Sequence, residues 1–582
     1  MNRARVARVA WIVLAAAAVA LPLSTANTYY LYLACSVGLL TVVTAGLNVL
    51  AGLTGQISLG HAGFYALGAY GAAVGATRLG WPLWLAAMTG IVLAAGVGAL
   101  VAAAALRVSG PYLAMVTIAF GIIVESVLVE WVSVTGGPGG IFRIPKVPLG
   151  RYYWAIAVSA AAALWLTANL RRSAWGRAFL AVKASEVAAE SLGLSAYHVR
   201  IVAFTVSAAF TGVAGALFAF LNGYISPDSF TLQTSILFLL ALLFGGMGSV
   251  AGPVVGSLAL TVLPELLTGL SDYRLILYGS LLLVSMYWLP SGLVGALARG
   301  PARARPTGSP TREEPWRFSA SIWEHGAPDP LLSATGVGLS FGGVVAVADV
   351  SLAIQPRRIH AIIGPNGAGK TSLLNVLTGY YAPDTGGITL GGLSIVGLPP
   401  YRIARLGVAR TFQTTQLFGD LTVRENVAVG LAGGHLGSIC AALLGTPRAR
   451  RVEAARMRDA DSLLVAMGFI ELADRPANSL PGGIRRRVEI ARALAGRPEI
   501  LMLDEPAAGL SPVEIEALDA ELSALRDGGG PAIILVEHHM DLVMAVSDTI
   551  SVLDYGRVIA SGSPESVREN PQVVEAYLGA GT

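Results

Sequence analysis

Long apolar runs fill the first 300 residues, and their lengths predict an α-helical polytopic membrane domain with about eight to ten spans. Runs long enough to cross a bilayer lie near residues 8–24, 29–50, 61–78, 82–106, 111–131, 152–170, 201–222, 232–250, 252–269 and 273–290. The glycine-rich run at 61–78 is expected either to span the membrane or to form a re-entrant or broken helix. The run at 8–24 also resembles a signal peptide, although the further runs favour a retained first span.

The pattern of apolar and polar positions changes after residue 294. Residues 295–330 are rich in Pro, Gly, Ala and Arg without apolar periodicity, which predicts a linker. Residues 331–582 alternate short β runs with helical stretches, which is typical of an α/β domain. We therefore expect a transmembrane domain at 1–294, a linker at 295–330 and an α/β domain at 331–582.

Charge divides the chain at nearly the same place. Residues 1–300 hold 15 Lys and Arg against 7 Asp and Glu, whereas the remaining residues hold 25 against 29. In a membrane domain, an excess of basic residues reports which loops face the cytoplasm, because basic loops stay on that side. It is therefore not evidence for nucleic-acid binding. The predicted cytoplasmic loop carries Arg171, Arg172, Arg177, Lys183 and Arg200. Two cysteines in the whole chain make a disulfide framework unexpected.

Polar residues inside apolar runs are candidates for function because they are costly to bury in a bilayer. Gln56, Ser58 and His61 lie in a stretch of glycines and other small residues that also predicts close helix packing. Glu125 and Glu130 lie in or at the end of another run, where a role in a transport pathway and a structural role are both open.

The cytoplasmic loop at 176–200 has the spacing of a short amphipathic helix followed by a break at Gly193. Its predicted apolar face includes Phe179, Val182, Val187, Ala188, Ser191, Leu192 and Leu194. Such a helix lies either on the lipid headgroups or in a site on a partner domain.

A phosphate-binding loop is the strongest motif of the second half. The stretch HAIIGPNGAGKTSLLNVL reads as a strand, a glycine-rich loop and a helix, and it matches G-x-x-x-x-G-K-[ST] completely. Its glycines let backbone N–H groups surround phosphates, while Lys370 neutralises phosphate oxygens and Thr371 reaches Mg²⁺. The predicted ATP-binding residues are Gly364, Pro365, Asn366, Gly367, Ala368, Gly369, Lys370, Thr371 and Ser372.

Polar residues also end or follow two further apolar strands. In EILMLDEP, Asp504 is expected to hold Mg²⁺ and Glu505 to polarise the attacking water. After AIILV, His538 is a candidate sensor of the γ-phosphate, although a lone histidine at a strand end is usually structural. Gln413 lies on a predicted loop between the two phosphate motifs and is a weak marker by itself.

The order of these motifs resembles that of ATP-binding cassette ATPases over residues 331–582. The resemblance assigns Phe341 to stacking on adenine and Gln413 to catalysis and the metal, beside Thr371 and Asp504. It also implies a signature loop for the ATP of a partner subunit, formed by Leu480, Pro481, Gly482 and Gly483.

The signature differs from the family's usual Leu-Ser-Gly-Gly-Gln at Pro481 and Ile484. Proline offers a phosphate neither a hydroxyl nor an N–H. Either the loop binds the partner's ATP more weakly, or Pro481 only shapes its backbone.

Longer stretches resemble branched-chain amino-acid importers. VARTFQTTQLFGDLTVRENV and DEPAAGLSP are similar to the LivG family of ATPases. GQISLGHAGFYALGAY, GPYLAMVTIAFG and GYISPDSFTLQTSI are similar to the LivM family of permeases. The chain therefore resembles a fusion of the two subunits, in which the 176–200 loop would be the coupling loop.

The resemblance implies ATP-driven import of branched-chain or other hydrophobic amino acids across the bacterial cytoplasmic (inner) membrane, with the ATPase domain in the cytoplasm. An importer of another small solute, such as urea, short amides or carboxylates, is the alternative. The implied cofactors are ATP and Mg²⁺. The implied partners are a second permease and a second ATPase subunit, in a hetero-oligomer or a homodimer, with an extracytoplasmic solute-binding protein and membrane lipid; no nucleic acid is expected.

Overall fold

The structure is a computed structural model that describes residues 27–106, 110–266, 291–298 and 329–578, with scattered positions at 19–22 and 273–289. The described residues form two compact units. The membrane unit holds those up to Arg172 and from Tyr197 to 298, together with Leu443–Gly445. The cassette unit holds Ser173–Ala196 and the other described residues from 329 onward. Most of the loop at 176–200 therefore packs as part of the cassette unit, although it lies between two membrane helices in sequence.

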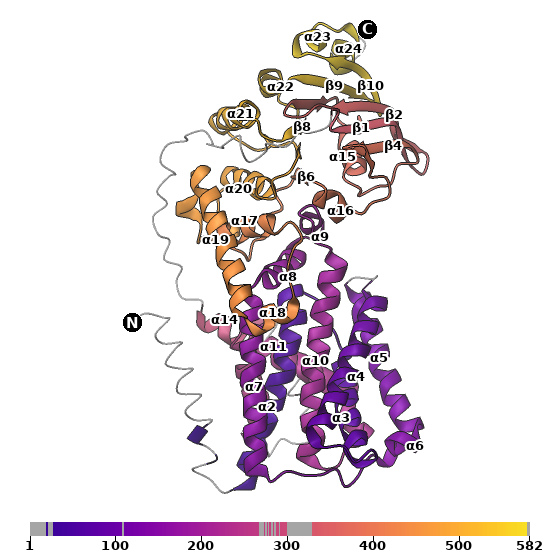
Figure 1. The fold of residues 1–582 in the computed structure, drawn as a ribbon, viewed down its shortest axis with the longest axis vertical. Helices are drawn as coiled ribbons and strands as arrows, with labels where there is room; N and C mark the ends of the chain where they lie inside the picture. The colour runs from indigo at the N-terminus through magenta and orange to yellow at the C-terminus, as the bar shows by residue number, and fades with distance from the viewer. Residues whose placement is uncertain are drawn as a thin grey trace. The chain divides into compact units, whose positions relative to one another are not determined.

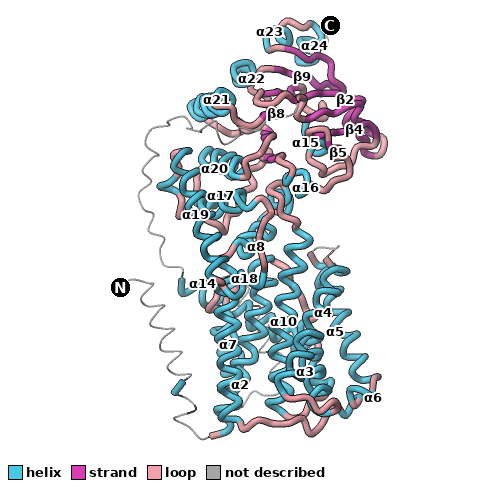
Figure 2. The backbone as a smooth tube through the Cα atoms, in the orientation of Figure 1, coloured by secondary structure: helices cyan, strands magenta, loops and turns pink. Residues whose placement is uncertain are grey.

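Helices make up most of the membrane unit (Figures 1 and 2). Six of its described helices are long and apolar enough to cross a membrane: Thr28–Leu53, Leu83–Ala105, Tyr112–Glu130, Leu149–Arg171, Ala196–Asn222 and Pro227–Gly245. In Figure 1 these correspond to α2 (Thr28–Leu47) with a π-helical end (Asn48–Leu53), α4 (Leu83–Ala105), α5 (Pro111–Glu130), α7 (Leu149–Arg171), α10 (Ala196–Asn222) and α11 (Leu232–Gly245). Shorter helices are α3 (His61–Thr77), α6 (Val132–Thr135), α12 (Gly252–Leu266) and α14 (Gly292–Ala298).

These six helices match six of the runs expected from sequence, and α3 and α12 match two more at shorter length. The run at 8–24 and most of the run at 273–290 lie outside the described residues, as does most of the expected linker. The count of eight to ten spans and the domain limits therefore stay predictions.

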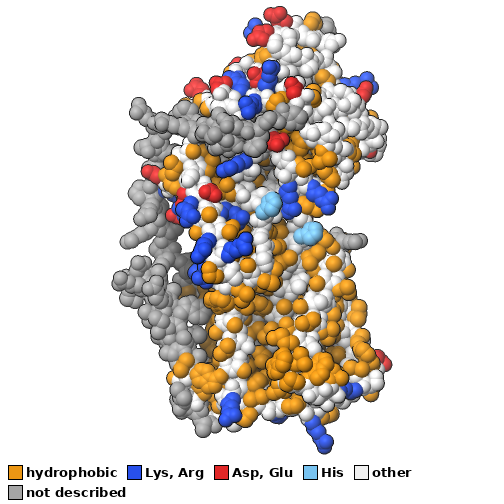
Figure 3. All heavy atoms as spheres, viewed as in Figure 1, with side chains coloured by type: hydrophobic (Ala, Val, Ile, Leu, Met, Phe, Trp, Pro, Cys, Tyr) orange, Lys and Arg blue, Asp and Glu red, His pale blue; other side chains and the backbone are white. Residues whose placement is uncertain are grey.

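Large apolar side chains cover the outside of the membrane unit, as expected for a surface that faces lipid. Trp84 and Val92 are each 68% exposed, and Leu100 is 74% exposed. In Figure 3 hydrophobic side chains spread over the face of this unit, whereas acidic and basic side chains gather over the cassette unit.

The glycine-rich stretch forms an uninterrupted helix, α3, and the irregular backbone lies before it, at residues 55–60. Small residues let α3 approach its neighbours closely. A Cβ added at Gly68 would lie 2.3 Å from the carbonyl oxygen of Gly212 in α10. Ser58 and Ser207 lie on either side of the buried His61 ring, at 3.0 Å and 2.8 Å from its two nitrogens. Ser58 and His61 are thus packed and hydrogen-bonded, whereas the buried Oε1 of Gln56 has no hydrogen-bond partner among the described residues.

Two sheets form the centre of the cassette unit. The antiparallel sheet has the order β2-β1-β4-β5, and the larger sheet has the order β10-β9-β3-β8-β7-β6. Their strands are β1 (Leu332–Phe341), β2 (Val344–Ile354), β3 (Ile359–Ile363), β4 (Thr385–Leu390), β5 (Leu393–Ser394), β6 (Val408–Arg410), β7 (Ile500–Asp504), β8 (Ala532–Val536), β9 (Thr549–Asp554) and β10 (Arg557–Gly562). Strands β9, β3, β8, β7 and β6 pair in parallel, which agrees with the α/β class expected from sequence.

Helices complete the cassette unit around these sheets (Figure 1). Strands β3, β7 and β8 each have five residues, and all of them are buried, as expected for parallel strands covered on both faces. The helices are α8 (Ala174–Ala184), α9 (Glu186–Glu190), α15 (Lys370–Leu377), α16 (Pro400–Arg405), α17 (Val423–Ala432), α18 (Ile439–Leu444), α19 (Pro447–Ala466), α20 (Gly482–Ala495), α21 (Pro512–Asp527), α22 (Met540–Val546), α23 (Pro564–Arg568) and α24 (Pro571–Leu578). The last two residues of α18 belong to the membrane unit.

Candidate functional site

The predicted catalytic residues gather because their strands are neighbours. Strands β3, β8, β7 and β6 run in parallel, so their carboxyl ends meet at one edge of the sheet. That edge is where parallel α/β sheets place their ligand sites. The phosphate loop follows β3, Asp504 ends β7, and His538 lies two residues after the end of β8. Gln413 lies three residues beyond the end of β6.

The phosphate loop, 364–369, has a backbone that only glycine adopts easily at several positions. Gly364, Gly367 and Gly369 have φ of +150°, +85° and +97°. A Cβ at Gly369 would lie 2.1 Å from the carbonyl oxygen of Ala346, so a side chain has no room there. Lys370 begins α15, and its Nζ donates to the carbonyl oxygens of Gly364 at 2.8 Å and Pro365 at 2.9 Å. Burial lowers the pKa of Lys370, and the carboxylates of Glu505 and Asp504 oppose that shift.

Glu505 lies between the two other residues that are expected to be catalytic. Its Oε2 accepts from Nε2 of Gln413 at 2.8 Å, and its Oε1 lies 2.9 Å from Nε2 of His538. The Glu505 backbone has φ of +48°, which is a strained conformation for a residue other than glycine. A hydrogen bond from its N–H to the carbonyl oxygen of Val536, at 2.8 Å, helps to hold this conformation. The structure therefore brings together three side chains from the ends of three strands, as the sequence motifs predict.

Asp504 has one paired and one unpaired carboxylate oxygen. Its Oδ2 accepts from Nη2 of Arg410 at 3.0 Å. Its Oδ1 is buried and has no hydrogen-bond partner among the described residues. Burial raises the pKa of Asp504, and the charge of Arg410 opposes that shift. A buried carboxylate oxygen beside a phosphate loop fits a magnesium ion, which prefers oxygen ligands.

The remaining ATP-binding candidates surround the phosphate loop. Thr371 and Ser372 follow Lys370 in the first turn of α15, with Thr371 exposed. Phe341 ends β1, is 45% exposed, and its ring centre lies 5.1 Å from that of Tyr381 in an edge-to-face contact. An exposed aromatic ring is available to stack on a base.

The signature residues lie elsewhere in the cassette unit. Pro481 is the residue before α20, and no side-chain cap supports this helix start. No hydrogen bond between residues 480–483 and the phosphate loop occurs in the part of the chain that the structure describes. Gly483 lies so close to Glu514 that an added Cβ would be 1.9 Å from its Oε1. The expected role of this loop toward another subunit's nucleotide stays a prediction.

Arg486 connects α20 to the group formed by Gln413, Glu505 and His538, and the sequence motifs did not single it out. Its guanidinium donates to the carbonyl oxygens of Phe412 and Gln413, and to that of Glu505 at 3.2 Å. It also pairs with Glu489 at 3.2 Å. The run of arginines after the signature is visible in the sequence, but which one turns inward depends on the packing of α20.

Glu537 is a second residue that sequence reasoning missed. Its Oε1 accepts from the N–H of Ala507 at 2.6 Å, and its Oε2 accepts from the N–H of His538 at 2.8 Å. It therefore fixes the loop after Glu505 and the backbone of His538 together.

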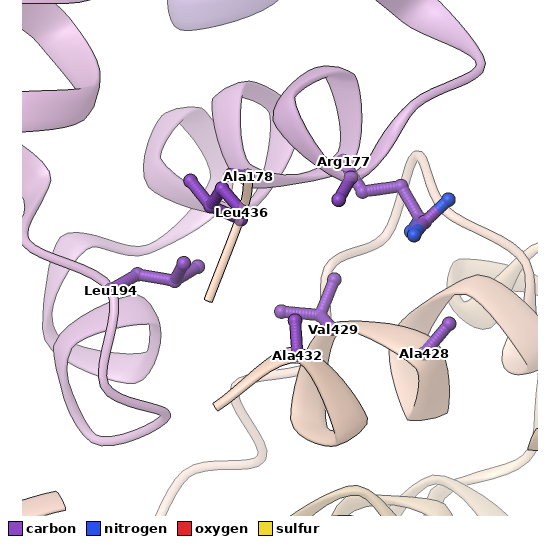
Figure 4. Close-up of a pocket in the computed structure, with 8 residues that line it drawn as sticks. Arg177, Ala178, Leu194, Ala428, Val429, Ala432 and Leu436 are labelled. Atoms are coloured by element: carbon purple, nitrogen blue, oxygen red, sulfur yellow. The ribbon is translucent and has the colours of Figure 1, made fainter. Parts of the chain in front are cut away.

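The segment 173–196 lies in a site on the cassette formed by α16, α17, α19 and the residues that follow α17. Ala178 and Leu194 face Val429, Ala432 and Leu436 (Figure 4). The buried guanidinium of Arg177 pairs with Glu453 of α19. The sequence left two positions open for this loop, on the lipid headgroups or in a site on a domain. In the structure its residues up to Ala196 pack in a site on the cassette.

Backbone carbonyl groups supply further contacts of this segment. Nε of Arg405 donates to the carbonyl oxygen of Gly193 at 2.8 Å, and Nε1 of Trp175 donates to that of Gly437 at 3.0 Å. Gly193 has φ of +81°, which confirms the expected break. Two short helices, α8 and α9, replace the single expected one. Val187 was placed on the apolar face but is 44% exposed, because the chain turns at Ser185 between α8 and α9.

Comparisons with known families match both halves of the chain. Residues 29–286 match the model of the branched-chain amino acid transport system permease component. Residues 347–508 match the ABC transporter model, and residues 557–582 match the branched-chain amino acid ATP-binding cassette transporter model.

Individual relatives divide in the same way. The ATP-binding protein LivG of Salmonella typhimurium is 47% identical over 250 residues, which cover 43% of this chain and 98% of the relative. The permease protein LivM of Escherichia coli K12 is 35% identical over 284 residues, covering 44% of this chain and 67% of the relative. A crystal structure of a nucleotide-free ATP-binding cassette from an ABC transporter aligns with 29% identity and a TM-score of 0.37, covering 43% of this chain and 99% of that chain. The chain therefore belongs to the family of branched-chain amino-acid ATP-binding cassette transporters and joins a LivM-like permease and a LivG-like ATPase in one polypeptide.

Proposed function

We propose that this chain imports branched-chain amino acids across the bacterial inner membrane, with its cassette on the cytoplasmic side. The names of the relatives support the substrate, because those proteins are a permease and an ATP-binding protein of high-affinity branched-chain amino-acid transport. The observation that carries the proposal is the position of Glu505 between Gln413 and His538, beside a complete phosphate loop.

The proposed roles follow from this geometry. Glu505 accepts a proton from the attacking water, and its contacts with Gln413 and His538 orient the carboxylate before the reaction. Lys370 exchanges its bonds to the loop carbonyl groups for the phosphates of ATP. Thr371, Asp504 and Gln413 would hold Mg²⁺, which supplies positive charge to the phosphates when bound.

Coupling to transport is proposed to pass through the segment 173–196. This segment belongs in sequence to the permease half, yet it packs in the cassette unit and is held there by Arg177 and Gly193. Movement of the cassette therefore moves a piece of the permease chain. Permease helices that alternate between two arrangements can use such a covalent connection to change access to a central pathway.

The proposed transporter contains a second permease and a second cassette in addition to this chain. In the proposed assembly two cassettes enclose two ATP molecules, and residues 480–483 face the ATP held by the partner's phosphate loop. The second permease and cassette come from another copy of this chain or from separate subunits. An extracytoplasmic solute-binding protein would deliver the substrate.

The catalytic assignment is tested by Glu505→Gln in the purified complete transporter. We expect ATP to bind with nearly unchanged affinity and hydrolysis to fall by about 10² to 10⁴, the usual contribution of a positioned general base. Glu499→Gln serves as a comparison, because it changes an exposed carboxylate just before β7, at the opposite end of that strand from Asp504, and hydrolysis should stay nearly unchanged. Unchanged hydrolysis after Glu505→Gln would contradict the assignment.

A further inference from the structure

A buried arginine, Arg410, lies between the candidate ATP site and the segment 173–196. Arg410 ends β6, three residues before Gln413, and it is 3% exposed. Its guanidinium makes contacts in two directions. One direction leads to Asp504, and the other leads to the residues that follow the phosphate loop.

The guanidinium is held firmly on both sides. Nη2 donates to Oδ2 of Asp504 at 3.0 Å. Nη1 donates to Oδ1 of Asn375 at 2.7 Å and to the hydroxyl of Thr378 at 3.0 Å, both at the end of the helix that begins at Lys370. Its central carbon lies 5.2 Å from the ring centre of Phe412, close enough for a cation–π attraction. A lysine has one compact charge and no planar fork, so it cannot make all of these contacts.

Tyr380 continues the chain of contacts toward the permease segment. Its ring centre lies 5.9 Å from the guanidinium carbon of Arg410. Its N–H donates to the carbonyl oxygen of Asn375 at 2.8 Å, so the backbone of Tyr380 is fixed to the residue that also holds Arg410. Its hydroxyl donates to the carbonyl oxygen of Val187 at 2.7 Å. Burial raises the pKa of Tyr380, so the phenol keeps the proton that it donates.

The acceptor on the permease segment is a shared one. The carbonyl oxygen of Val187, in α9, also accepts from the N–H of Ser191 at 3.0 Å. A change at the Tyr380 hydroxyl therefore acts on the turn that leads from α9 to Gly193. The contacts form one continuous path, from Asp504 through Arg410 and Tyr380 to Val187.

Charge at Asp504 decides how strongly Arg410 is held toward the ATP site. Both groups are buried, and an attraction between opposite charges is strong in a buried environment. This attraction weakens when either charge also interacts with a third ion. Asp504 has an unpaired, buried Oδ1 that fits a cation, and sharing its charge with a cation weakens its attraction for Arg410. The guanidinium then relies on Asn375, Thr378 and the aromatic rings beside it.

We propose that Arg410 is a positioning residue that links the state of Asp504 to the hold of Tyr380 on Val187. Occupation of the ATP site loosens the Arg410–Asp504 pair and alters the bond between Tyr380 and the permease segment. Coupling between two sites is reciprocal, so a displaced segment 173–196 also alters the hold on Asp504. This inference rests on the proposed transport function and adds a specific route through residues that the sequence motifs leave unassigned.

The two variants that test the route act at its two ends. Arg410→Lys keeps the charge and loses the fork that joins Asp504 to Asn375 and Thr378. Tyr380→Phe keeps the ring beside Arg410 and removes only the hydroxyl that bonds Val187. Tyr555→Phe is the matched control, because it removes the hydroxyl of an exposed tyrosine in the turn between β9 and β10, away from this path.

The measurement is amide hydrogen exchange of residues 186–192 in the complete transporter in lipid nanodiscs. Exchange is followed without nucleotide, with ATP and Mg²⁺, and with ATP and EDTA, using a hydrolysis-deficient Glu505→Gln background. We expect ATP with Mg²⁺ to change the exchange of this peptide, and each test variant to reduce that change by about fivefold or more. Nucleotide affinity, measured with a fluorescent ATP analogue, should stay within about threefold for Tyr380→Phe, which a general loss of folding would not allow.

Each outcome bears on the route. Equal responses to ATP with Mg²⁺ in the parent and in both variants would overturn it, as would a parent that does not respond. If Arg410→Lys fails to assemble, Tyr380→Phe alone decides the question. The double variant should add little beyond either change, because both interrupt one path. Amino-acid uptake by the unmodified transporter is measured separately: its absence refutes the proposed function, whereas uptake with fully responsive variants refutes only the role of Arg410.

Discussion

The ion pair between Arg177 and Glu453 is expected to hold the segment 173–196 on the cassette. Arg177 is 3% exposed and Glu453 is 20% exposed, so the pair is screened only partly by water. Removing one partner of a fully buried pair costs about 3–5 kcal/mol. Glu453 also lies 3.7 Å from Arg456, which compensates part of its charge when Arg177 is replaced. We therefore expect Arg177→Met to weaken the docking of α8 by about 2–3 kcal/mol.

This loss should appear as local opening of the segment rather than as global unfolding. A change of 2–3 kcal/mol corresponds to about 30- to 150-fold faster amide exchange at residues 178–184, since about 1.4 kcal/mol is a factor of ten. Methionine keeps most of the apolar stem, so the effect reports the charge rather than the packing. Arg448→Met changes an exposed arginine on α19 and should leave the exchange rates unaltered. Acceleration of less than about threefold in Arg177→Met would refute the reasoning.

Three further predictions concern pH, packing and the signature. Burial lowers the pKa of His360 to about 4, below its unfolded value of 6.5, so its contribution to stability is present above pH 6.5 and is lost as the pH falls toward 4. Wild type should lose about 2 kcal/mol more than His360→Leu between pH 7 and pH 5 in unfolding measurements, and parallel curves would contradict this. Gly256→Ala should destabilise the membrane unit by about 1–3 kcal/mol, because the new Cβ meets a carbonyl oxygen at 1.8 Å, whereas Gly96→Ala, with open space around it, should be tolerated in the same thermal assay. Pro481→Ser with Ile484→Gln should raise ATP turnover of the assembled transporter by about tenfold, since a bond to a charged phosphate is worth about 1.5 kcal/mol or more, and an unchanged rate would mean that Pro481 only shapes the loop.

The gathering of the candidate site residues could be predicted from the sequence because each motif ends or follows a buried strand. Apolar strands that pair in parallel bring their carboxyl ends together, so Lys370, Glu505 and His538 had to lie near one edge. The same logic finds Gln413 only when the motif order is considered, since a glutamine on a loop has no pattern of its own. Local sequence patterns predict these positions because each buried strand determines where the residue that follows it lies.

Long-range packing was beyond the reach of the sequence pattern. Arg410 and Arg486 are buried arginines, and each has a hydrogen-bond partner more than 70 residues away in the sequence. No periodicity in the sequence identifies such distant pairs. Val187 was misplaced because a single amphipathic helix was expected where Ser185 starts a second helix. In the membrane, the glycine-rich stretch indicated close packing, but whether the backbone breaks within α3 or before it depends on neighbouring helices.

The most direct test of the account is uptake of a labelled branched-chain amino acid into proteoliposomes that contain the complete transporter and its solute-binding protein. With the binding protein and substrate outside and ATP with Mg²⁺ inside, the account predicts uptake against a concentration gradient. That uptake should stop when ATP is omitted and in Glu505→Gln. Accumulation that continues without ATP, or at the wild-type rate in Glu505→Gln, would contradict the claim that this cassette drives import.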